Sequence, residues 1–187
     1  TIETVMIGSS RRNTLCISSQ VGCAIDCRFC ASGLAGLTRN LTAAEIVDQI
    51  IQVRALAGPN RPINNIVLMG MGEPLDNYDA TVDAVRLMIL PEALKLSSRK
   101  VTLSTAGQVD LIKKFQEEDL PVNLAISLNA TDDITRGDIM PINKKYPIEV
   151  LMECLRNYPL KPSRRLTFEY VMLGGINDRD DDAKRLA

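Results

Sequence analysis

The stretch Cys23-Ala24-Ile25-Asp26-Cys27-Arg28-Phe29-Cys30 places three thiols on one short segment of the chain. Thiolates this close together can converge on a single inorganic centre, because soft sulfur ligands favour zinc or an iron–sulfur cluster. Three protein ligands on a four-iron cluster leave one iron open, and an open position suits a site that carries out chemistry. A structural metal site usually fills all of its positions with protein ligands.

Two other interpretations of the same thiols stay open at this point. Cys16 lies upstream and could complete a closed zinc site with four cysteines, although zinc ribbons usually pair two CxxC knuckles and this chain has one group of thiols. The three cysteines could also be ordinary buried thiols, and their close spacing argues against this.

Composition limits the class of protein. The chain has 187 residues, of which 45% are hydrophobic and 24% charged, with a formal net charge of −1. These values predict one globular domain, or part of one, and indicate neither disorder nor a membrane protein. Five cysteines, three of them bunched, argue against a disulfide framework and predict the reducing cytoplasm. The sequence has no histidine, which excludes Ser-His-Asp hydrolysis and HExxH zinc proteolysis.

Short apolar segments alternate with helical ones along the chain, which predicts parallel βα units and an α/β fold. The helix after the cysteine stretch has the clearest boundaries, with Thr42 and Glu45 as a capping box and Gly58-Pro59 as its stop. We expect strands over residues 1–7, 14–19, 63–69, 100–104, 122–127 and 165–172. We expect helices over residues 42–57, 79–90, 109–118, 132–139 and 148–157, with the start of another within 178–187.

Three groups of small, polar or acidic residues directly follow predicted strands. Glycines let a backbone approach a ligand closely, a carboxylate suits an ammonium group, and hydroxyl and amide groups suit a ribose or a carboxylate. The ends of parallel strands carry the ligands in barrel folds, although each group could also be an ordinary βα turn. The groups are Gly70-Met71-Gly72-Glu73-Pro74, Ser104-Thr105-Ala106-Gly107 and Ser127-Leu128-Asn129-Ala130.

The cysteine stretch resembles the CxxxCxxC signature of the radical-SAM superfamily, in which an aromatic residue such as Phe29 is also typical. The resemblance implies that Cys23, Cys27 and Cys30 bind a [4Fe–4S] cluster whose open iron is chelated by S-adenosylmethionine (SAM). An electron from the cluster then breaks the sulfonium bond and makes a 5′-deoxyadenosyl radical. The implied fold is a partial (β/α)6 barrel, here truncated at the C-terminal end, with five core strands beginning at Cys16. We expect residues 1–15 to form an N-terminal strand and turn, and residues 16–187 to form the incomplete barrel core.

Further motifs resemble the RNA adenine carbon-2 methyltransferases of that superfamily. They lie in order at family spacing: CISSQVGCxxxCxFC, RNLTAAEI, NIVLMGMGEPL, VTLSTAG, SLNA, MPINKKY and FEYVMLGGIND. The resemblance implies methylation of an adenosine in 23S rRNA and of one in tRNA through a methyl-cysteine intermediate. Asn129 stands where His is commoner in the family, and Gly137 where an acidic residue is commoner. An N-terminal helical RNA-binding domain and a C-terminal segment with the methyl-carrying cysteine are expected outside this chain, so we do not expect it to complete methyl transfer.

The resemblance also assigns roles to single residues. Cys16 would be the second catalytic thiol, which helps to resolve a covalent protein–RNA adduct, and Glu3 would be a proton acceptor. The Gly72-Glu73 element would bind the methionine amino group. From the residues alone, Cys16 could be a buried small hydrophobe and Glu3 a solvated surface carboxylate, and Cys154 is expected to be a packing cysteine. The implied cofactor-binding residues are Gly72, Glu73, Ser104, Ser127, Leu128 and Asn129.

The partners implied by the resemblance are 23S rRNA, tRNA and a flavodoxin-like electron donor, with a monomeric protein, no membrane partner and a cytoplasmic location. Composition adds little support for RNA binding, because 23 acidic residues offset the basic pairs and aromatic residues make up only 4%. Lys144-Lys145 is the predicted phosphate contact. The alternatives are a radical-SAM enzyme with a different, small-molecule substrate and a four-cysteine zinc structural module.

Overall fold

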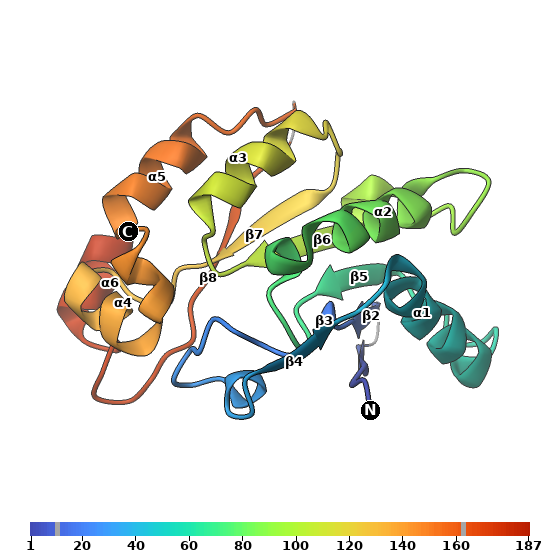
Figure 1. Cartoon of the computed structure of the whole chain (residues 1–187), viewed down its shortest axis with the longest axis horizontal. Coiled ribbons are helices and arrows are strands. Elements are labelled where there is room, and N and C mark those ends of the chain that lie inside the picture. The colour runs from blue at the N-terminus through green and yellow to red at the C-terminus, as the bar shows by residue number, and fades with distance from the viewer. Residues whose placement is uncertain (10–11, 162–163) are drawn as a thin grey trace.

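A computed structural model of the chain describes residues 1–9, 12–161 and 164–187. Its main sheet has the strand order β1-β2-β5-β6-β7-β8 (Figure 1). β1 pairs antiparallel with β2, and every other pairing in this sheet is parallel, so five parallel strands form the core as predicted. The strands are β1 (Val5–Gly8), β2 (Asn13–Cys16), β5 (Asn65–Leu68), β6 (Val101–Thr105), β7 (Asn123–Ser127) and β8 (Thr167–Glu169).

Helices follow the strands as the sequence predicts, within one or two residues at most ends. Four of them arch over the outer face of the curved sheet in Figure 1: α1 (Ala43–Ala57), α2 (Tyr78–Ile89), α3 (Val109–Glu117) and α5 (Ile148–Arg156). α4 (Asp133–Ile139) and α6 (Asp180–Leu186) lie together at the end of the sheet where β7 and β8 finish. The structure therefore confirms an α/β fold with the layout of a partial barrel.

Two apolar clusters hold the helices against the sheet. One contains Leu15 and Ile66 from the strands with Met88 from α2, and the other contains Leu103 with Phe115 from α3. All five side chains are at most 1% exposed. Because side chains alternate along a strand, the residues between these apolar positions face the opposite, inner side of the sheet.

The start of α1 confirms the predicted capping box. The Thr42 hydroxyl accepts from the backbone N–H of Glu45 at 3.2 Å, and the Glu45 carboxylate accepts from the backbone N–H of Thr42 at 2.9 Å. Two groups that would otherwise lack partners at the helix end are thereby satisfied. Gly58, at a φ of 70°, ends the helix as expected.

A small hairpin, β3 (Gln20–Gly22) with β4 (Leu37–Asn40), was not expected from the sequence. β4 is exposed along its whole length, so it has no apolar alternation to reveal it. The hairpin closes the cysteine loop, residues 23–36. Gly22 allows the closure, because a Cβ there would lie 1.9 Å from the Gly36 carbonyl oxygen and its φ is 81°.

Several predicted strands were too long. β1 starts at Val5 rather than at residue 1, β2 ends at Cys16 rather than at residue 19, and β8 covers Thr167–Glu169 rather than residues 165–172. The turn expected after β1 includes residues 10 and 11, which lie outside the described residues. Within the part of the chain that the structure describes, each helix is too short or too polar to cross a membrane.

Candidate active site

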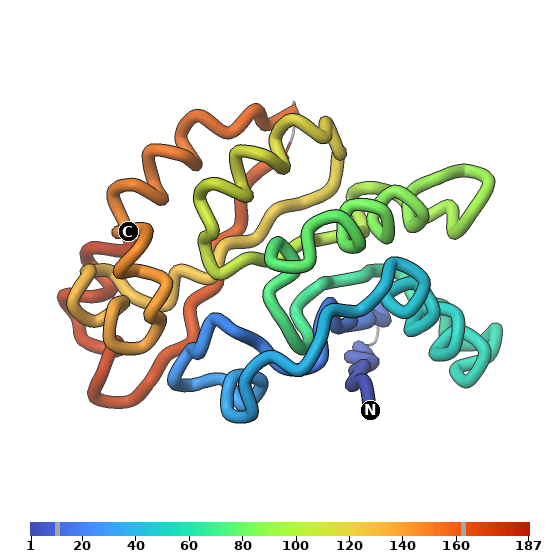
Figure 2. Tube along the Cα trace, in the orientation of Figure 1, coloured from blue at the N-terminus to red at the C-terminus, as the bar shows by residue number. Residues whose placement is uncertain are grey.

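A cavity of about 310 Å³ lies at the carboxyl ends of the parallel strands, on the inner side of the sheet. The cysteine loop forms one wall, and the segments that follow β5, β6, β7 and β8 form the others. Figure 2 traces this arrangement from the cysteine loop (blue) to the segment after β8 (red). Its lining residues include Cys23, Cys27, Cys30, Gly72, Glu73, Ser104, Ser127, Asn129 and Glu169.

The three cysteines of the loop are half-buried and line the same cavity. Burial, and to a smaller extent the nearby thiols Cys23 and Cys30, raise the pKa of the Cys27 thiol to about 12. The thiols are thus close enough to oppose one another's ionisation. A protonated thiol is a poor metal ligand, so a metal centre would have to displace these protons, as thiolate ligands generally require.

The shape of the cysteine loop follows from contacts with α4 and with itself. The backbone N–H of Arg28 donates to the Ile139 carbonyl at 2.9 Å, and that of Cys30 donates to the Cys27 carbonyl at 2.9 Å. Ile25 packs in a third apolar cluster with Ile139 and Met140, against which Cys23, Cys27 and Phe29 also pack. The loop therefore rests on the end of α4.

The residues fit an iron–sulfur cluster by the chemistry of their donors: three thiols on one loop, beside a cavity. Among the residues that the structure describes, no group of three or more His, Cys, Asp or Glu side chains is arranged as a ready metal-ion site. Cys16 does not join the three thiols in the cavity lining. It ends β2, on the same inner face of the sheet as Ser104, Ser127 and Glu169.

Glu73 is buried in the cavity wall, with 3% of its surface exposed. Its Oε2 accepts from the backbone N–H of Ala106 at 2.7 Å, and its Oε1 accepts from that of Leu75 at 3.1 Å. Burial raises the pKa of Glu73 to about 7, and these N–H groups oppose the rise. The carboxylate thus ties the turn after β5 to the end of β6. Gly72 before it has a φ of 102°, and a Cβ there would lie 2.6 Å from the Gln20 side chain, so the turn requires glycine.

Glu169, at the end of β8, is a site residue that sequence reasoning missed. Its Oε2 accepts from the hydroxyl of Ser104 at 2.6 Å and from the hydroxyl of Ser127 at 2.9 Å. Two predicted cofactor contacts therefore meet on one carboxylate. The signal was hidden because the strand was predicted to run to residue 172, which placed Glu169 in its middle rather than at its end.

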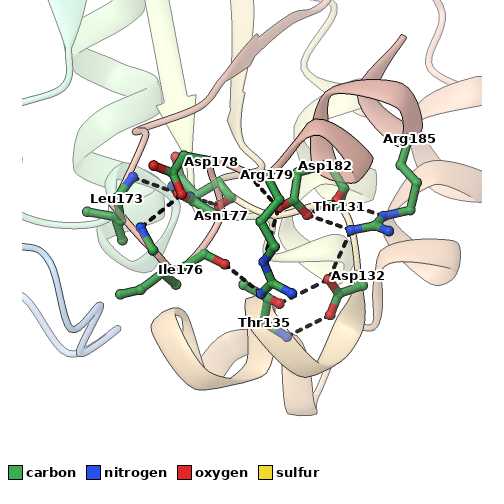
Figure 3. Close-up of polar contacts among 12 residues, drawn as sticks. Thr131, Asp132, Thr135, Leu173, Ile176, Asn177, Asp178, Arg179, Asp182 and Arg185 are labelled. Carbon is green, nitrogen blue, oxygen red and sulfur yellow. Dashed lines mark hydrogen bonds and ion pairs between the residues drawn. The ribbon is translucent and has the colours of Figure 1, made fainter.

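Asn129 lines the cavity and fixes the chain that follows β8. Its φ is 57°, a left-handed conformation that Asn tolerates better than most residues. Its side-chain oxygen accepts from the backbone N–H of Val171 at 2.9 Å. Its backbone oxygen accepts from the side chain of Asn177, which is 1% exposed, at 2.7 Å. Figure 3 shows how Asn177 belongs to a polar network that also holds α6, through Asp182 and Thr131 at 2.9 Å.

Three predicted site residues lie outside the cavity lining. Leu128 is buried, and its backbone N–H and carbonyl make hydrogen bonds in the protein interior. Glu3 is exposed, and its carbonyl oxygen accepts from the Ser18 hydroxyl at 2.7 Å. Cys16 is half-buried, and burial raises its pKa, with Glu169 adding to the rise.

Two further predictions concern residues away from the cavity. Cys154 is buried in the cluster under α3 and α5, as expected for a packing cysteine. Lys145 pairs with Asp110 at 3.6 Å and lies 4.7 Å from the centre of the Tyr146 ring. Lys144 ends a short 3₁₀ helix, Pro141–Lys144. A phosphate contact at these lysines stays a prediction.

Comparison with known proteins places the chain in a family. A profile described as the Radical SAM superfamily matches residues 17–187. The chain belongs to the radical SAM superfamily. This agrees with the family expected from its motifs.

Relatives within the superfamily carry a more specific description. The chain is 51% identical over 185 residues to a dual-specificity RNA methyltransferase RlmN of Syntrophobacter fumaroxidans, covering 99% of this chain and 54% of that protein. A second RlmN, from Pelobacter propionicus, is 54% identical over 185 residues, covering 99% and 52%. The resemblance to this group of RNA methyltransferases, predicted from the motifs, is confirmed.

A solved structure supports the radical SAM fold independently. The crystal structure of a radical SAM methyltransferase from Sphaerobacter thermophilus superposes with a TM-score of 0.93 and 45% identity, covering 99% of this chain and 55% of that one. The chain spans about half the length of the relatives it matches. The partial barrel that the sequence predicts is thus the fold of this part of the family.

Proposed function

We propose that this chain is the catalytic core of a radical SAM enzyme that methylates adenine at carbon 2 in 23S rRNA and tRNA through a methyl-cysteine intermediate. The observation that carries the proposal is the convergence of three loop thiols and the polar strand ends on one cavity. Identity of 51–54% with dual-specificity RNA methyltransferases supports the choice of substrate.

Cys23, Cys27 and Cys30 would hold a [4Fe–4S] cluster, and the cavity beside them would take SAM. When bound, the two supply reductive cleavage of a carbon–sulfur bond of SAM. The protein's own part is to bind, orient and keep water out. Phe29, Ile25 and Met140 provide apolar lining next to the thiols.

Polar groups at the strand ends would orient the cofactor. The Gly72 turn brings backbone close to the cavity, and Glu73 supplies a carboxylate for an ammonium group while it holds two backbone N–H groups. Ser104 and Ser127, both anchored on Glu169, offer hydroxyl oxygens to a ribose or carboxylate. Asn129 completes this set in the proposal, and Leu128, whose backbone groups are bonded in the interior, would hold Asn129 and Glu169 in place.

Cys16 and Glu3 keep their proposed roles, as the resolving thiol and the proton acceptor. The position of Cys16 on the inner face of the sheet supports the first role. Burial and Glu169 raise the pKa of Cys16, so the thiol needs a base before it can act as a nucleophile. The exposed position of Glu3 requires the N-terminal segment to move, or RNA to reach it, before Glu3 can accept a proton there.

The remaining assignments follow from the same proposal. The partners are 23S rRNA, tRNA and a flavodoxin-like electron donor, and the protein acts as a monomer in the cytoplasm. All five cysteines are free thiols, which suits a reducing compartment. Residues 1–15 would precede the barrel core of residues 16–187.

An anaerobic experiment tests the proposal in two steps. Reconstitution with iron and sulfide should give a brown protein that, once reduced, converts SAM to 5′-deoxyadenosine. A colourless protein with one tightly held zinc would instead favour the structural module. The second step uses the longer protein that includes the methyl-carrying cysteine, with rRNA or tRNA as substrate. 2-Methyladenosine in the RNA supports the proposal, and SAM cleavage without it would favour a radical SAM enzyme with another substrate.

A further inference from the structure

Arg136, in the middle of α4, is completely buried, with an exposed fraction of 0%. Its Nε donates to the carbonyl of Leu128 at 2.9 Å, and its Nη2 donates to the carbonyls of Ala106 at 2.8 Å and Ser127 at 3.1 Å. Its Nη1 donates to Oδ1 of Asn143 at 2.9 Å. Every one of these acceptors is a neutral oxygen. Buried charges in proteins are normally paired or bound to metal ions. Among the residues that the structure describes, Arg136 has hydrogen-bond acceptors but no carboxylate in ion-pair contact.

The nearest acidic group on its own helix, Asp133, is already engaged. Its Oδ1 accepts from the side chain of Asn143 at 2.9 Å and from the backbone N–H of Ile148 at 2.8 Å. Burial lowers the pKa of Arg136 to about 10, which leaves it a cation at neutral pH. The Asp133 carboxylate is therefore held by Asn143 and Ile148, while Arg136 keeps its charge among neutral oxygens.

The packing of α4 brings the charge of Arg136 behind the cysteine loop. α4 forms the support on which the cysteine loop rests, through the hydrogen bond from Arg28 to Ile139 and the apolar cluster shared by Ile139 and Cys27. Arg136 joins this support to the ends of β6 and β7. Arg136 is not among the described residues that line the cavity. Its effect on a centre bound there would therefore be electrostatic and would not involve direct contact.

We propose that Arg136 is a positioning residue that supplies a buried positive charge behind the cysteine loop and thereby stabilises the reduced state of the cluster bound there. The inference rests on the proposed function. A cluster held by three thiolates becomes more negative when it accepts an electron, and net charge and burial are among the properties that set cluster potentials. A buried cation is screened far less than a surface cation, so its effect on the potential is correspondingly larger.

The test measures the midpoint potential of the reconstituted cluster by redox titration monitored by electron paramagnetic resonance. Arg136→Gln removes the charge, and the potential should become more negative than in the unmodified protein. Arg136→Lys keeps the charge, and its potential should return toward that of the unmodified protein. Arg28→Gln is the matched control, because it removes the same charge from an exposed position on the cysteine loop itself. Its shift should be small and should disappear at high salt.

A second variant keeps the test decisive if Arg136→Gln fails to fold or to bind iron. Arg136→Met removes the charge with an unbranched apolar side chain that adds no new charge or polar group, so it should also make the potential more negative. A purely structural role for Arg136 predicts an unchanged potential in a folded, iron-loaded Arg136→Met or Arg136→Gln protein, and that result overturns the inference. If the unmodified protein takes up no iron, the proposed function fails instead, which separates the two failures.

Discussion

The two faces of the main sheet bury different kinds of side chain. The helix-covered face buries apolar residues such as Ile66, Leu103 and Phe115, whereas the cavity side buries Glu73 and Arg136, all with no more than 3% exposure. Burial of apolar surface favours folding, whereas burial of a charge costs free energy unless hydrogen bonds and nearby charges compensate for it. We infer that apolar burial on the helix-covered face stabilises the fold. Part of that stability offsets the free-energy cost of burying charged groups on the cavity side, around a charged centre.

The largest effect that would test this division is on metal binding. Replacing Cys23, Cys27 or Cys30 by Ala should abolish iron loading almost completely, because a cluster with three protein ligands cannot tolerate the loss of one. The thermal unfolding of the iron-free protein should change little, since the thiols are only half-buried. Iron and sulfide content after anaerobic reconstitution, together with melting curves of the apo protein, measures both.

Two other cysteines serve as controls for that result. Cys16→Ala and Cys154→Ala should bind iron like the unmodified protein, because neither thiol lines the cavity in the described structure. Loss of iron in Cys16→Ala would instead support a centre with four cysteine ligands.

A large-to-small substitution on the helix-covered face should lower stability and leave iron binding unchanged, the opposite of the cysteine variants. Phe115, on α3, is 1% exposed in the cluster with Leu103 and Leu151. Phe115→Ala should lower the free energy of unfolding by about 3–5 kcal/mol, because it removes a large buried ring and leaves a cavity. Urea unfolding of the apo protein gives the stability, and iron content per folded molecule should stay unchanged.

The matching surface change is Leu56→Ala on α1, where the side chain is 86% exposed. It should alter stability by no more than about 0.5 kcal/mol. If Phe115→Ala reduced iron binding in protein that remains folded, the two faces of the sheet would be coupled, and the division drawn above would be wrong.

The helix-covered face could be predicted from the sequence, and much of the cavity side could not. Ile66 and Leu68 alternate with less buried neighbours along β5, and such periodicity is a local signal. The three cysteines and the Gly72-Glu73 turn were predicted because their spacing is local too. Arg136 was not singled out, because its burial depends on carbonyls at the ends of β6 and β7, which meet only in the folded chain.

The acid–base behaviour of Glu73 gives a prediction of intermediate size. Folding raises its pKa from the ordinary value of 4.5 to about 7. Between these values the folded state holds a proton that the unfolded state has released, so stability falls as the pH rises from about 4.5 to about 7. The contribution is about 3 kcal/mol, from the size of the shift and about 1.4 kcal/mol for each pH unit.

Glu73→Gln isolates this contribution, because glutamine does not titrate. Urea midpoints of the apo protein should decline with pH more steeply in the unmodified chain than in the variant. Asp76 also has a pKa raised by burial and contributes a decline of the same sign to both proteins. Parallel curves for the two proteins would show that Glu73 keeps an ordinary pKa in the folded state.

Apart from the Leu56 control, the smallest expected effect lies at the exposed start of α1, away from the cavity wall. Thr42→Ala removes the hydroxyl that accepts from the backbone N–H of Glu45, and should cost about 1 kcal/mol in urea unfolding. Thr42→Ser keeps the hydroxyl and should restore most of that stability. Iron loading should be the same in both variants, because a cap stabilises its helix without contacting the thiols.

Thr42 nevertheless follows β4, which closes the cysteine loop against β3. Lower iron loading in Thr42→Ala than in Thr42→Ser would therefore show that the start of α1 controls the shape of that loop, and that the stabilising region extends to the thiols.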